Sequence, residues 1–355
     1  MRTLAVVGGG VIGLSAAWRA AGAGWTVTLF DPASGSGSSW VAGGMLAPLS
    51  EGWPGEDAAL EFGAASLTRW PVFAAELKAV TGVDVFVADA TLTVALDAAD
   101  AADLRTIADW VNARGHELSL LDRAGVRAAE PSLGRGVRAG LLAAAEPAVD
   151  NRALVNALQA ACRQAGVEFR AERVEAPAEL PHDRVVLAAG AATAQVWPGL
   201  PVRPVKGEIL RLRRRPSAPT PPTRVIRARV HGRPIYLVPR GDGIVLGATQ
   251  YEVGFDNAVT VAGVRDLITD AEAVLPGLGE YEFAEAVAGS RPGSPDNLPL
   301  IGYLDDKVIV AAGHGRNGIL DTPVTADAVL ALLADRELPE ARSADPRRFI
   351  SGGVR

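Results

Sequence analysis

The stretch "LAVVGGGVIGLSAAWRAAGAGWTVTLFD", residues 4–31, decides the fold of this chain. It opens with four apolar residues, which are typical of a parallel strand that is covered on both faces. Gly8, Gly10 and Gly13 then fit the pattern G-x-G-x-x-G. In this pattern the first glycine permits a tight turn, the second lets the backbone approach a pyrophosphate, and the third lets a helix pack against a strand.

The rest of this stretch supplies the context that the glycine pattern needs. A helix is predicted from about Val11 to Ala23, and its free N–H groups would point at phosphates. "WTVTLF" is predicted to be the second strand, and Asp31 at its end can accept hydrogen bonds from both ribose hydroxyls. A glycine-rich turn without a ligand would leave Asp31 unexplained. The order of these elements predicts an adenine dinucleotide, and it does not separate NAD from FAD.

A second unit of the same kind lies near the other end, in "VIVAAGHGRNGILDTPVTADAVLALL", residues 308–333. It predicts a buried strand, a glycine-rich turn and a helix that starts after Gly318. A further glycine turn is expected in "DRVVLAAGAATA", residues 183–194. FAD has an adenine end and an isoalloxazine end, so two distant turns can serve one cofactor. The late helix dipole would stabilise negative charge on reduced flavin. A simple NAD-dependent dehydrogenase needs no such late unit.

A Ser/Gly-rich loop follows Asp31, "PASGSGSSWVAGGMLAP", residues 32–48. The loop is too long for a tight connection between elements. Its N–H and hydroxyl groups could bind phosphate or a ring edge. A plain flexible loop is the alternative, which the apolar Val41, Met45 and Leu46 weaken.

The middle of the chain alternates between two kinds of pattern. Helices are predicted at 56–80, 97–114 and after Asp150, an expected N-cap, with a strand at 91–96. Antiparallel strands are predicted around 203–215 and 233–250, the second turning at Gly241-Asp242-Gly243. The expected fold is α/β, with a Rossmann-type FAD-binding domain interwoven with an antiparallel-β substrate domain (α+β). The expected boundaries are 1–78, 137–203 and 290–340 for the FAD-binding domain, 79–136 and 204–289 for the substrate-binding domain, and 341–355 for a tail.

Composition narrows the classes of partner and of location. A net charge of −6 argues against a nucleic-acid partner. The basic run "RLRRR" (211–215) is expected to be a strand with one solvent-exposed face. The single cysteine, Cys162, excludes a disulfide within the chain and fits a reducing cytoplasm, with a buried packing role. The four histidines show no metal-ligand spacing, and no apolar run reaches the ~20 residues of a membrane span. Three consecutive glycines argue against a signal peptide, so a cytoplasmic protein is expected.

Six stretches occur in an order that is specific for one group of enzymes. They are "VVGGGVIGL", "VAGGMLAP", "RPVKGEILRLR", "IYLVPRGDGIVLGATQ", "GSRPGSPDNLPLIG" and "AAGHGRNGIL". The chain resembles the glycine oxidases of the D-amino-acid oxidase superfamily that serve thiamine biosynthesis, along nearly its whole length. The resemblance implies noncovalent FAD and the oxidation of a small amine acid by oxygen. It implies that glycine becomes an imine and that hydrogen peroxide forms. The imine would then hydrolyse to glyoxylate and ammonia or be consumed by the thiazole-forming enzyme. It also implies a homo-oligomer, a tetramer.

The resemblance assigns site residues by position. Arg291 would bind the substrate carboxylate, and Tyr236, Arg316 and Met45 would complete the pocket. The cofactor would contact Gly8, Gly10, Val11, Ile12, Gly13, Asp31, Ser38, Ser39, Gly43, Gly44, Met45, Val174, Gly190, His314, Gly315, Arg316, Asn317, Gly318, Ile319 and Leu320. Arginine suits the substrate role because two of its N–H groups can bind one carboxylate and orient it. No metal is assigned.

Alternatives stay open at these positions. Arg291 could form a surface salt bridge, Tyr236 could be a residue of a sheet face, and His314 could act through its backbone. Two residues depart from the group: Gln250 replaces a methionine that group members can carry, and Asp321 replaces an apolar residue, where its charge would oppose reduced flavin. No cysteine follows Cys162, so the covalent flavin link of the related sarcosine oxidases is not expected. A wider-pocket D-amino-acid or secondary-amine oxidase and a noncatalytic flavin-binding sensor remain rivals.

Overall fold

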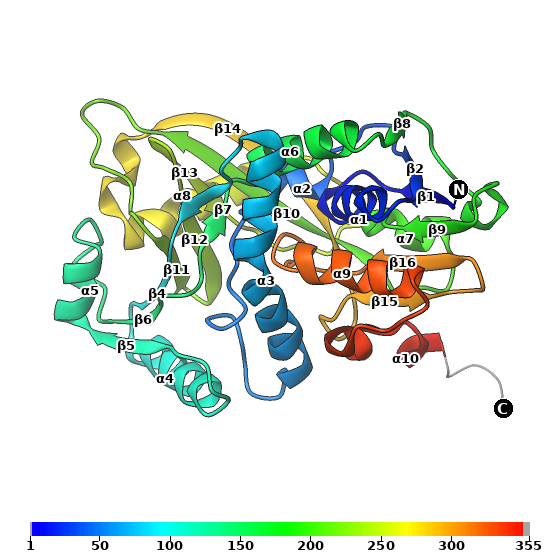
Figure 1. Ribbon diagram of the computed structural model, residues 1–355. Coiled ribbons are helices and arrows are strands. Elements are labelled where there is room, and N and C mark those ends of the chain that lie inside the picture. The colour runs from blue at the N-terminus through cyan, green and yellow to red at the C-terminus, as the bar shows by residue number, and fades with distance from the viewer. Residues whose placement is uncertain (1, 351–355) are drawn as a thin grey trace.

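The first glycine unit belongs to a six-stranded sheet in the computed structural model, which describes residues 2–350 (Figure 1). The strand order is β15-β16-β9-β1-β2-β8. The strands are β1 (Thr3–Val7), β2 (Thr26–Phe30), β8 (Glu168–Arg170), β9 (Arg184–Leu187), β15 (Leu300–Tyr303) and β16 (Val308–Ala312). All neighbours pair in parallel except β15, which is antiparallel to β16. The strands of both predicted nucleotide units and of the third glycine turn therefore share one sheet.

Six of the described helices belong to this half of the molecule. They are α1 (Val11–Gly22), α2 (Ser38–Val41), α3 (Asp57–Thr81), α6 (Asn151–Gln164), α7 (Thr193–Val196) and α9 (Thr322–Leu333). Two of them, α1 and α9, contact strands of the sheet, while α3 and α6 pack against those two. Helix α1 contacts both α6 and α9, and its residues lie in one buried cluster with theirs. The predicted N-cap is confirmed, because the Asp150 carboxylate accepts hydrogen bonds from the N–H groups of Arg152 and Ala153.

The second sheet has eight strands in the order β14-β10-β13-β12-β11-β4-β6-β5. They are β4 (Thr91–Ala95), β5 (Ser119–Asp122), β6 (Ala139–Ala143), β10 (Arg203–Arg213), β11 (Val225–Val230), β12 (Arg233–Arg240), β13 (Gly243–Gly247) and β14 (Glu282–Gly293). The hairpin between β12 and β13 turns at Gly241, which has a φ of +55°, as the Gly-Asp-Gly sequence predicts. Among the described strands of this second sheet, only β4 and β11 pair in parallel, and the other neighbours are antiparallel.

The remaining elements cover this sheet or connect the two. They are α4 (Ala98–Asn112), α5 (Arg123–Ala129), α8 (Val261–Val274), α10 (Arg347–Ile350), the two-stranded ribbon of β3 (Phe86–Ala88) and β7 (Ala148–Val149), and the 3-10 helices η1 (Pro177–Glu179), η2 (Gly190–Ala192), η3 (Pro276–Glu280) and η4 (Pro339–Ala344). In Figure 1, α4, α5 and the second sheet lie at the left, and α1, α9 and the first sheet lie at the right. The segment expected to be a tail begins within η4 and includes α10, while 351–355 lie outside the described residues.

Two expectations about single side chains have different outcomes. Cys162 is fully buried, burial raises the pKa of its thiol to about 12, and its sulfur lies 3.2 Å from the Leu14 carbonyl oxygen, so it is a packing residue. The prediction that Arg211 lies on a solvent-exposed face of its strand is wrong. The Arg211 side chain is only 17% exposed, because Glu285 of the neighbouring strand β14 and Asn151 at the start of α6 lie beside it. Arg213, two residues further on, is 61% exposed.

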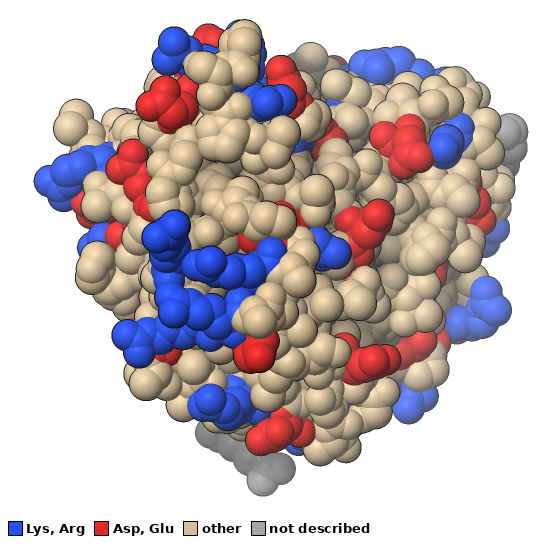
Figure 2. All heavy atoms as spheres, turned by 90° about the vertical axis from the view of Figure 1, so that its left-hand side faces the viewer, with Lys and Arg blue, Asp and Glu red and all other residues tan. Residues whose placement is uncertain are grey.

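The surface carries both signs of charge. Figure 2 shows the face at the left of Figure 1, where one group of Lys and Arg side chains is bordered by acidic side chains. No helix within residues 2–350 has the length and apolar character needed to cross a membrane.

Candidate active site

A cavity of about 800 Å³ is lined by residues from both sheets. Such a volume suits a cofactor-sized ligand. Most of the residues assigned from the sequence line it. They are Gly8, Gly10, Val11, Ile12, Asp31, Ser38, Ser39, Gly43, Gly44, Met45, Val174, Gly190, Tyr236, Arg291, His314, Gly315, Arg316, Asn317, Gly318 and Ile319. Segments far apart in the sequence therefore meet at one cavity.

Two assigned residues, Gly13 and Leu320, do not line the cavity. A Cβ at Gly13 would collide with the Gly8 carbonyl oxygen, so Gly13 is needed where α1 crosses close over the turn after β1. Leu320 is buried, and its carbonyl oxygen accepts hydrogen bonds from the Trp70 indole and the Ser66 hydroxyl. Both residues lie behind the lining of the cavity and support it from there.

The turn between β1 and α1 has the geometry of a phosphate site. Gly8 has a φ of +110°, and a Cβ there would collide with the carbonyl oxygen of Ala188 on the neighbouring segment. Helix α1 begins after Gly10, which has no side chain to cap it, and the positive end of the helix dipole faces the cavity. The hydroxyl of Ser39 accepts a hydrogen bond from the Val11 N–H at 3.1 Å. The glycine turn and the positive end of α1 thus face the place where a pyrophosphate would lie.

Asp31 lies at the edge of this turn, at the end of β2. Its Oδ2 accepts a hydrogen bond from the Gly9 N–H at 2.6 Å, and its Oδ1 accepts one from the Ala33 N–H at 2.7 Å. Each carboxylate oxygen has a second lone pair, so the carboxylate can still accept hydrogen bonds from two hydroxyls. The position fits the ribose role that the spacing predicts.

The Ser/Gly-rich loop leads from the phosphate end to the other end of the cavity. The Ser38 hydroxyl donates a hydrogen bond to the Ser290 carbonyl oxygen, which ties the loop to β14. A Cβ at Gly43 would lie 2.8 Å from the Tyr236 ring, so only glycine leaves space between loop and ring. The loop, the first turn and the late turn form a long cavity with phosphate donors at one end and aromatic and cationic side chains at the other. These residues fit FAD.

The late turn differs in detail from the expectation. Helix α9 begins at Thr322, four residues later than Gly318, because residues 319–321 form a turn of their own. His314 in this turn is buried, its Nε2 lies 3.0 Å from the Thr325 hydroxyl, and burial lowers its pKa to about 3. Its imidazole is therefore neutral at physiological pH.

Asp321 is buried outside the lining of the cavity. It is 3% exposed, and burial raises the pKa of its carboxyl well above the ordinary value. A neutral carboxyl would not oppose an anionic reduced cofactor. The departure at this position is thus compatible with the site. Gln250 lines the cavity with a polar side chain.

Tyr236 and Arg291 form one wall of the cavity, where the Tyr236 ring lies against Gly43. Burial raises the pKa of the Tyr236 hydroxyl, and the nearby Arg291 guanidinium opposes that rise. Arg291 Nη1 donates to the Thr249 carbonyl oxygen at 3.2 Å. The guanidinium lies against Gly207, where any side chain would collide with it. A cation and a hydroxyl donor, both half-buried, therefore lie together at the cavity, the arrangement that a carboxylate ligand needs.

Two more charged residues, Glu51 and Arg227, belong to the same wall, and the sequence patterns did not predict them. Glu51 Oε1 lies 3.0 Å from Arg227 Nη2, and its Oε2 accepts from Arg316 Nε at 2.6 Å. Burial would raise the pKa of Glu51, but the two arginines outweigh burial and leave it below its ordinary value. Nothing in the strand pattern of "VIRARV" separates Arg227, 18% exposed, from Arg229, 56% exposed. Only the fold distinguishes them.

A buried carboxyl group, Glu146, supports the loop that carries Glu51. It accepts hydrogen bonds from the N–H groups of Leu49 and Ser50 and from the Ser50 hydroxyl. Arg227 Nη1 in turn donates to the Ser50 carbonyl and hydroxyl oxygens, each at 3.2 Å. Burial raises the pKa of Glu146 to about 7 although its donors lower it. The sequence offered no signal for this residue, because it belongs to no motif.

Comparison with known proteins places this geometry in a family. The model of the DAO family, described as FAD dependent oxidoreductase, matches residues 3–332. The glycine oxidase of Pseudomonas aeruginosa is 32% identical, with 94% of each protein covered. The bifunctional protein ThiO/ThiG of Synechocystis sp. is 32% identical over 98% of this chain and 54% of its own length. The chain thus spans about half the length of the bifunctional relatives that it matches.

A solved structure agrees with the sequence comparison. The crystal structure of glycine oxidase from Geobacillus kaustophilus superposes with a TM-score of 0.89, at 28% identity and with 97% of this chain and 98% of that chain covered. The family match spans both the dinucleotide turn and the late turn. A cavity that fits FAD, built from these turns, is the feature that the family description requires. The chain therefore belongs to the DAO family of FAD-dependent oxidoreductases.

Proposed function

We propose that this enzyme oxidises glycine to its imine, with oxygen as the electron acceptor and hydrogen peroxide as the second product. The observation that carries the proposal is the pairing of Arg291 with Tyr236 at one wall of the cofactor cavity. The resemblance to glycine oxidases, now joined by relatives of that name, supports glycine as the amine acid.

The residues of the wall bind and orient the substrate. Arg291 donates two parallel hydrogen bonds to the substrate carboxylate, and the Tyr236 hydroxyl donates a third. Holding the carboxylate in place would fix the orientation of the Cα–H bond inside the cavity that Gly43 and the late turn line. Positioning of this kind can supply about 7–11 kcal/mol of the barrier to reaction. Bound FAD would supply the acceptor for the two electrons removed from the substrate, with oxygen as their final acceptor.

The substrate amine must lose a proton before it can give up hydride. Glu51 is held ionised by two arginines, His314 is buried and neutral, and Tyr236 has a raised pKa. Each is therefore a poor base at neutral pH. The enzyme accordingly selects the neutral amine or lets water remove the proton.

The imine product has two fates. Free imine hydrolyses to glyoxylate and ammonia, and a thiazole-forming partner enzyme would consume it first. The existence of a relative named ThiO/ThiG, in which two activities share one chain, supports such a partner.

The test is peroxide release and oxygen uptake by the purified yellow protein with glycine, sarcosine and D-alanine. Glycine should give the highest kcat/KM. A clear preference for D-alanine would replace the proposal with a D-amino-acid oxidase, and a preference for sarcosine with a secondary-amine oxidase. No peroxide with any of the three would contradict oxidase activity and favour a flavin-binding sensor.

A further inference from the structure

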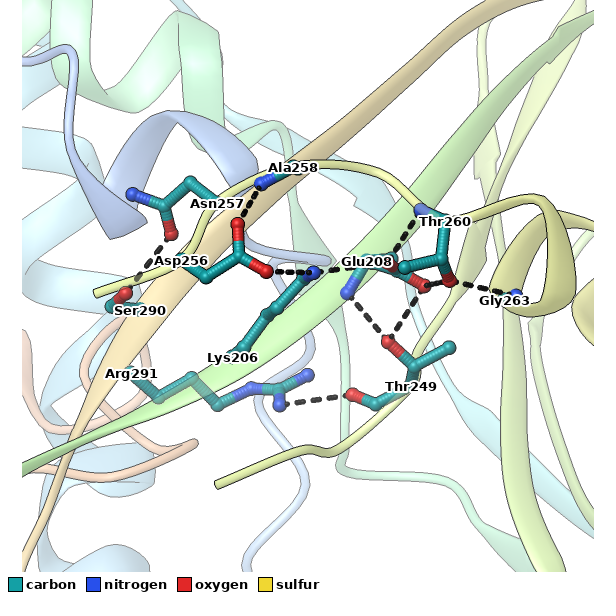
Figure 3. Close-up of polar contacts among 10 residues, drawn as sticks. All are labelled: Lys206, Glu208, Thr249, Asp256, Asn257, Ala258, Thr260, Gly263, Ser290 and Arg291. Atoms are coloured by element: carbon teal, nitrogen blue, oxygen red, sulfur yellow. Dashed lines mark hydrogen bonds and ion pairs between the residues drawn. The ribbon is translucent and has the colours of Figure 1, made fainter. Parts of the chain in front are cut away.

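Strand β10 places two opposite charges in the protein interior, on the face opposite the cavity. Lys206 is 1% exposed and Glu208 is fully buried, with 3.4 Å between Nζ and Oε1 (Figure 3). Gly207 between them faces the other way, against the Arg291 guanidinium. A buried ion pair rarely stabilises a fold more than two apolar side chains would. The pair therefore calls for an explanation other than stability.

Glu208 holds both ends of a strap, which we define as residues 250–259. At one end, Thr249 Oγ1 donates to Glu208 Oε2 at 3.3 Å and accepts from the Glu208 N–H at 2.9 Å. At the other end, the Thr260 N–H donates to Glu208 Oε1 at 2.8 Å. One carboxylate thus closes the strap into a loop (Figure 3).

Lys206 and Ser290 hold the middle of the strap. The backbone of Lys206 exchanges two hydrogen bonds with Tyr251, at 2.9 and 3.0 Å. Its ammonium group lies 3.4 Å from Asp256 Oδ2, and the Ser290 hydroxyl donates to Asn257 Oδ1 at 2.9 Å. The strap is mostly solvent-exposed on its outer side, yet Gln250, Phe255 and Asn257 line the cavity.

The strap anchor also reaches Arg291. Thr249 is bonded to Glu208 through its hydroxyl and accepts a hydrogen bond from Arg291 Nη1 through its carbonyl oxygen. Figure 3 shows the guanidinium pointing toward Thr249. Lys206 and Glu208 lie on the face of β10 that points away from this guanidinium. A shift of Thr249 would therefore move or release the guanidinium.

We propose that Glu208, through Thr249, is a positioning residue for the carboxylate-binding Arg291, and that Lys206 balances its charge and holds the strap as part of the cavity wall. This inference rests on the proposed function, in which Arg291 receives the substrate carboxylate. Misplacement of a positioning group by about 1 Å can cost on the order of 100-fold in rate.

The test uses two variants that change the anchor in different ways. Glu208→Gln removes the charge and keeps the shape, and Thr249→Val removes the hydroxyl and keeps the carbonyl. Both should raise the KM for glycine roughly tenfold or more, with a smaller fall in kcat, because the carboxylate is held less well. Thr249→Ser keeps the hydroxyl and should restore the wild-type KM.

A second readout does not depend on turnover. Acetate, a carboxylate without an amine, is titrated against the FAD-loaded protein, and its Kd is obtained from the flavin absorbance and from the rise in Tm. The Kd should increase in Glu208→Gln and Thr249→Val by about the same factor as the KM. Asp270→Asn is the matched control, because Asp270 is a buried, ion-paired carboxylate in α8 that does not line the cavity. It should lower the Tm without changing either constant.

The outcomes distinguish a failure of the positioning role of Glu208 from a failure of the proposed glycine oxidation. If both anchor variants lower the Tm as the control does but bind acetate and glycine like the wild type, the pair is structural and the inference is wrong. If the wild type binds acetate through Arg291, as an Arg291→Ala comparison would show, but does not oxidise glycine, the proposed function fails while the positioning result stands. A wild type that binds no carboxylate would overturn both.

Discussion

The substrate's own amine, and not a side chain, should set the acid limb of kcat/KM. The perturbation is His314→Ala, which removes the one histidine that lines the cavity in the described part of the chain. Burial lowers the pKa of His314 from 6.5 to about 3, so protonating the imidazole costs about 5 kcal/mol more than in water. At pH 7 roughly one molecule in 10,000 would carry that proton. A base with so low a pKa gives little driving force for taking a proton from an ammonium group.

The assay is kcat/KM against pH for glycine and for a second amino acid with a different amine pKa. The acid limb should move by the difference between the two amine pKa values, in the wild type and in His314→Ala alike. A lower rate in the variant leaves the position of the limb unchanged. Glu146→Gln is the second protein to measure, because Glu146, with a pKa of about 7, is the buried group near the site that would titrate in this range.

Two results would refute this reasoning. A limb that is the same for both substrates and shifts in His314→Ala would make His314 the base. A limb that disappears in Glu146→Gln would assign it to Glu146, acting on Glu51 through Ser50 and Arg227.

Three further predictions follow from single groups. Arg291→Ala should raise the KM for glycine at least about 30-fold, since truncating one partner of a buried charge pair costs roughly 2–5 kcal/mol. Arg213→Ala, at an exposed site, should change the KM little. Equal effects of the two substitutions in steady-state kinetics would contradict the assignment of Arg291. Acid or heat denaturation should release all yellow chromophore into the filtrate, because the single cysteine, Cys162, is buried as a thiol; flavin that stays with the precipitate would contradict noncovalent binding. Glu146 has a folded-state pKa above its unfolded value, so its contribution to stability is fully present below about pH 4.5 and is lost as the pH rises through about 7. Relative to Glu146→Gln, the wild type should lose roughly 3 kcal/mol of unfolding free energy across that range in urea titrations, and parallel pH curves for the two proteins would disprove the shift.

Local patterns predicted the parts of this protein that local physics governs. Gly8 and Gly13 are required by a turn and by a close crossing within one strand-turn-helix unit, so their spacing already predicts a dinucleotide site. The Asp150 cap and the Gly241 turn are similarly short-range, and the structure contains both. The recurrence of a glycine turn near the chain end predicted a second contact with a long cofactor, and both turns do line one cavity.

The tertiary structure decided which charged side chains are buried and what they face. Alternation along a strand shows which residues share a face, but it does not show what covers that face, so Arg211 was expected in water and lies under neighbouring elements. Glu51 and Arg227 come from distant segments and form an ion pair only because the loop after α2 meets β11. The same holds for Asp321, whose carboxyl has a raised pKa because the interior around it disfavours charge, a property of its surroundings and not of its place in the sequence.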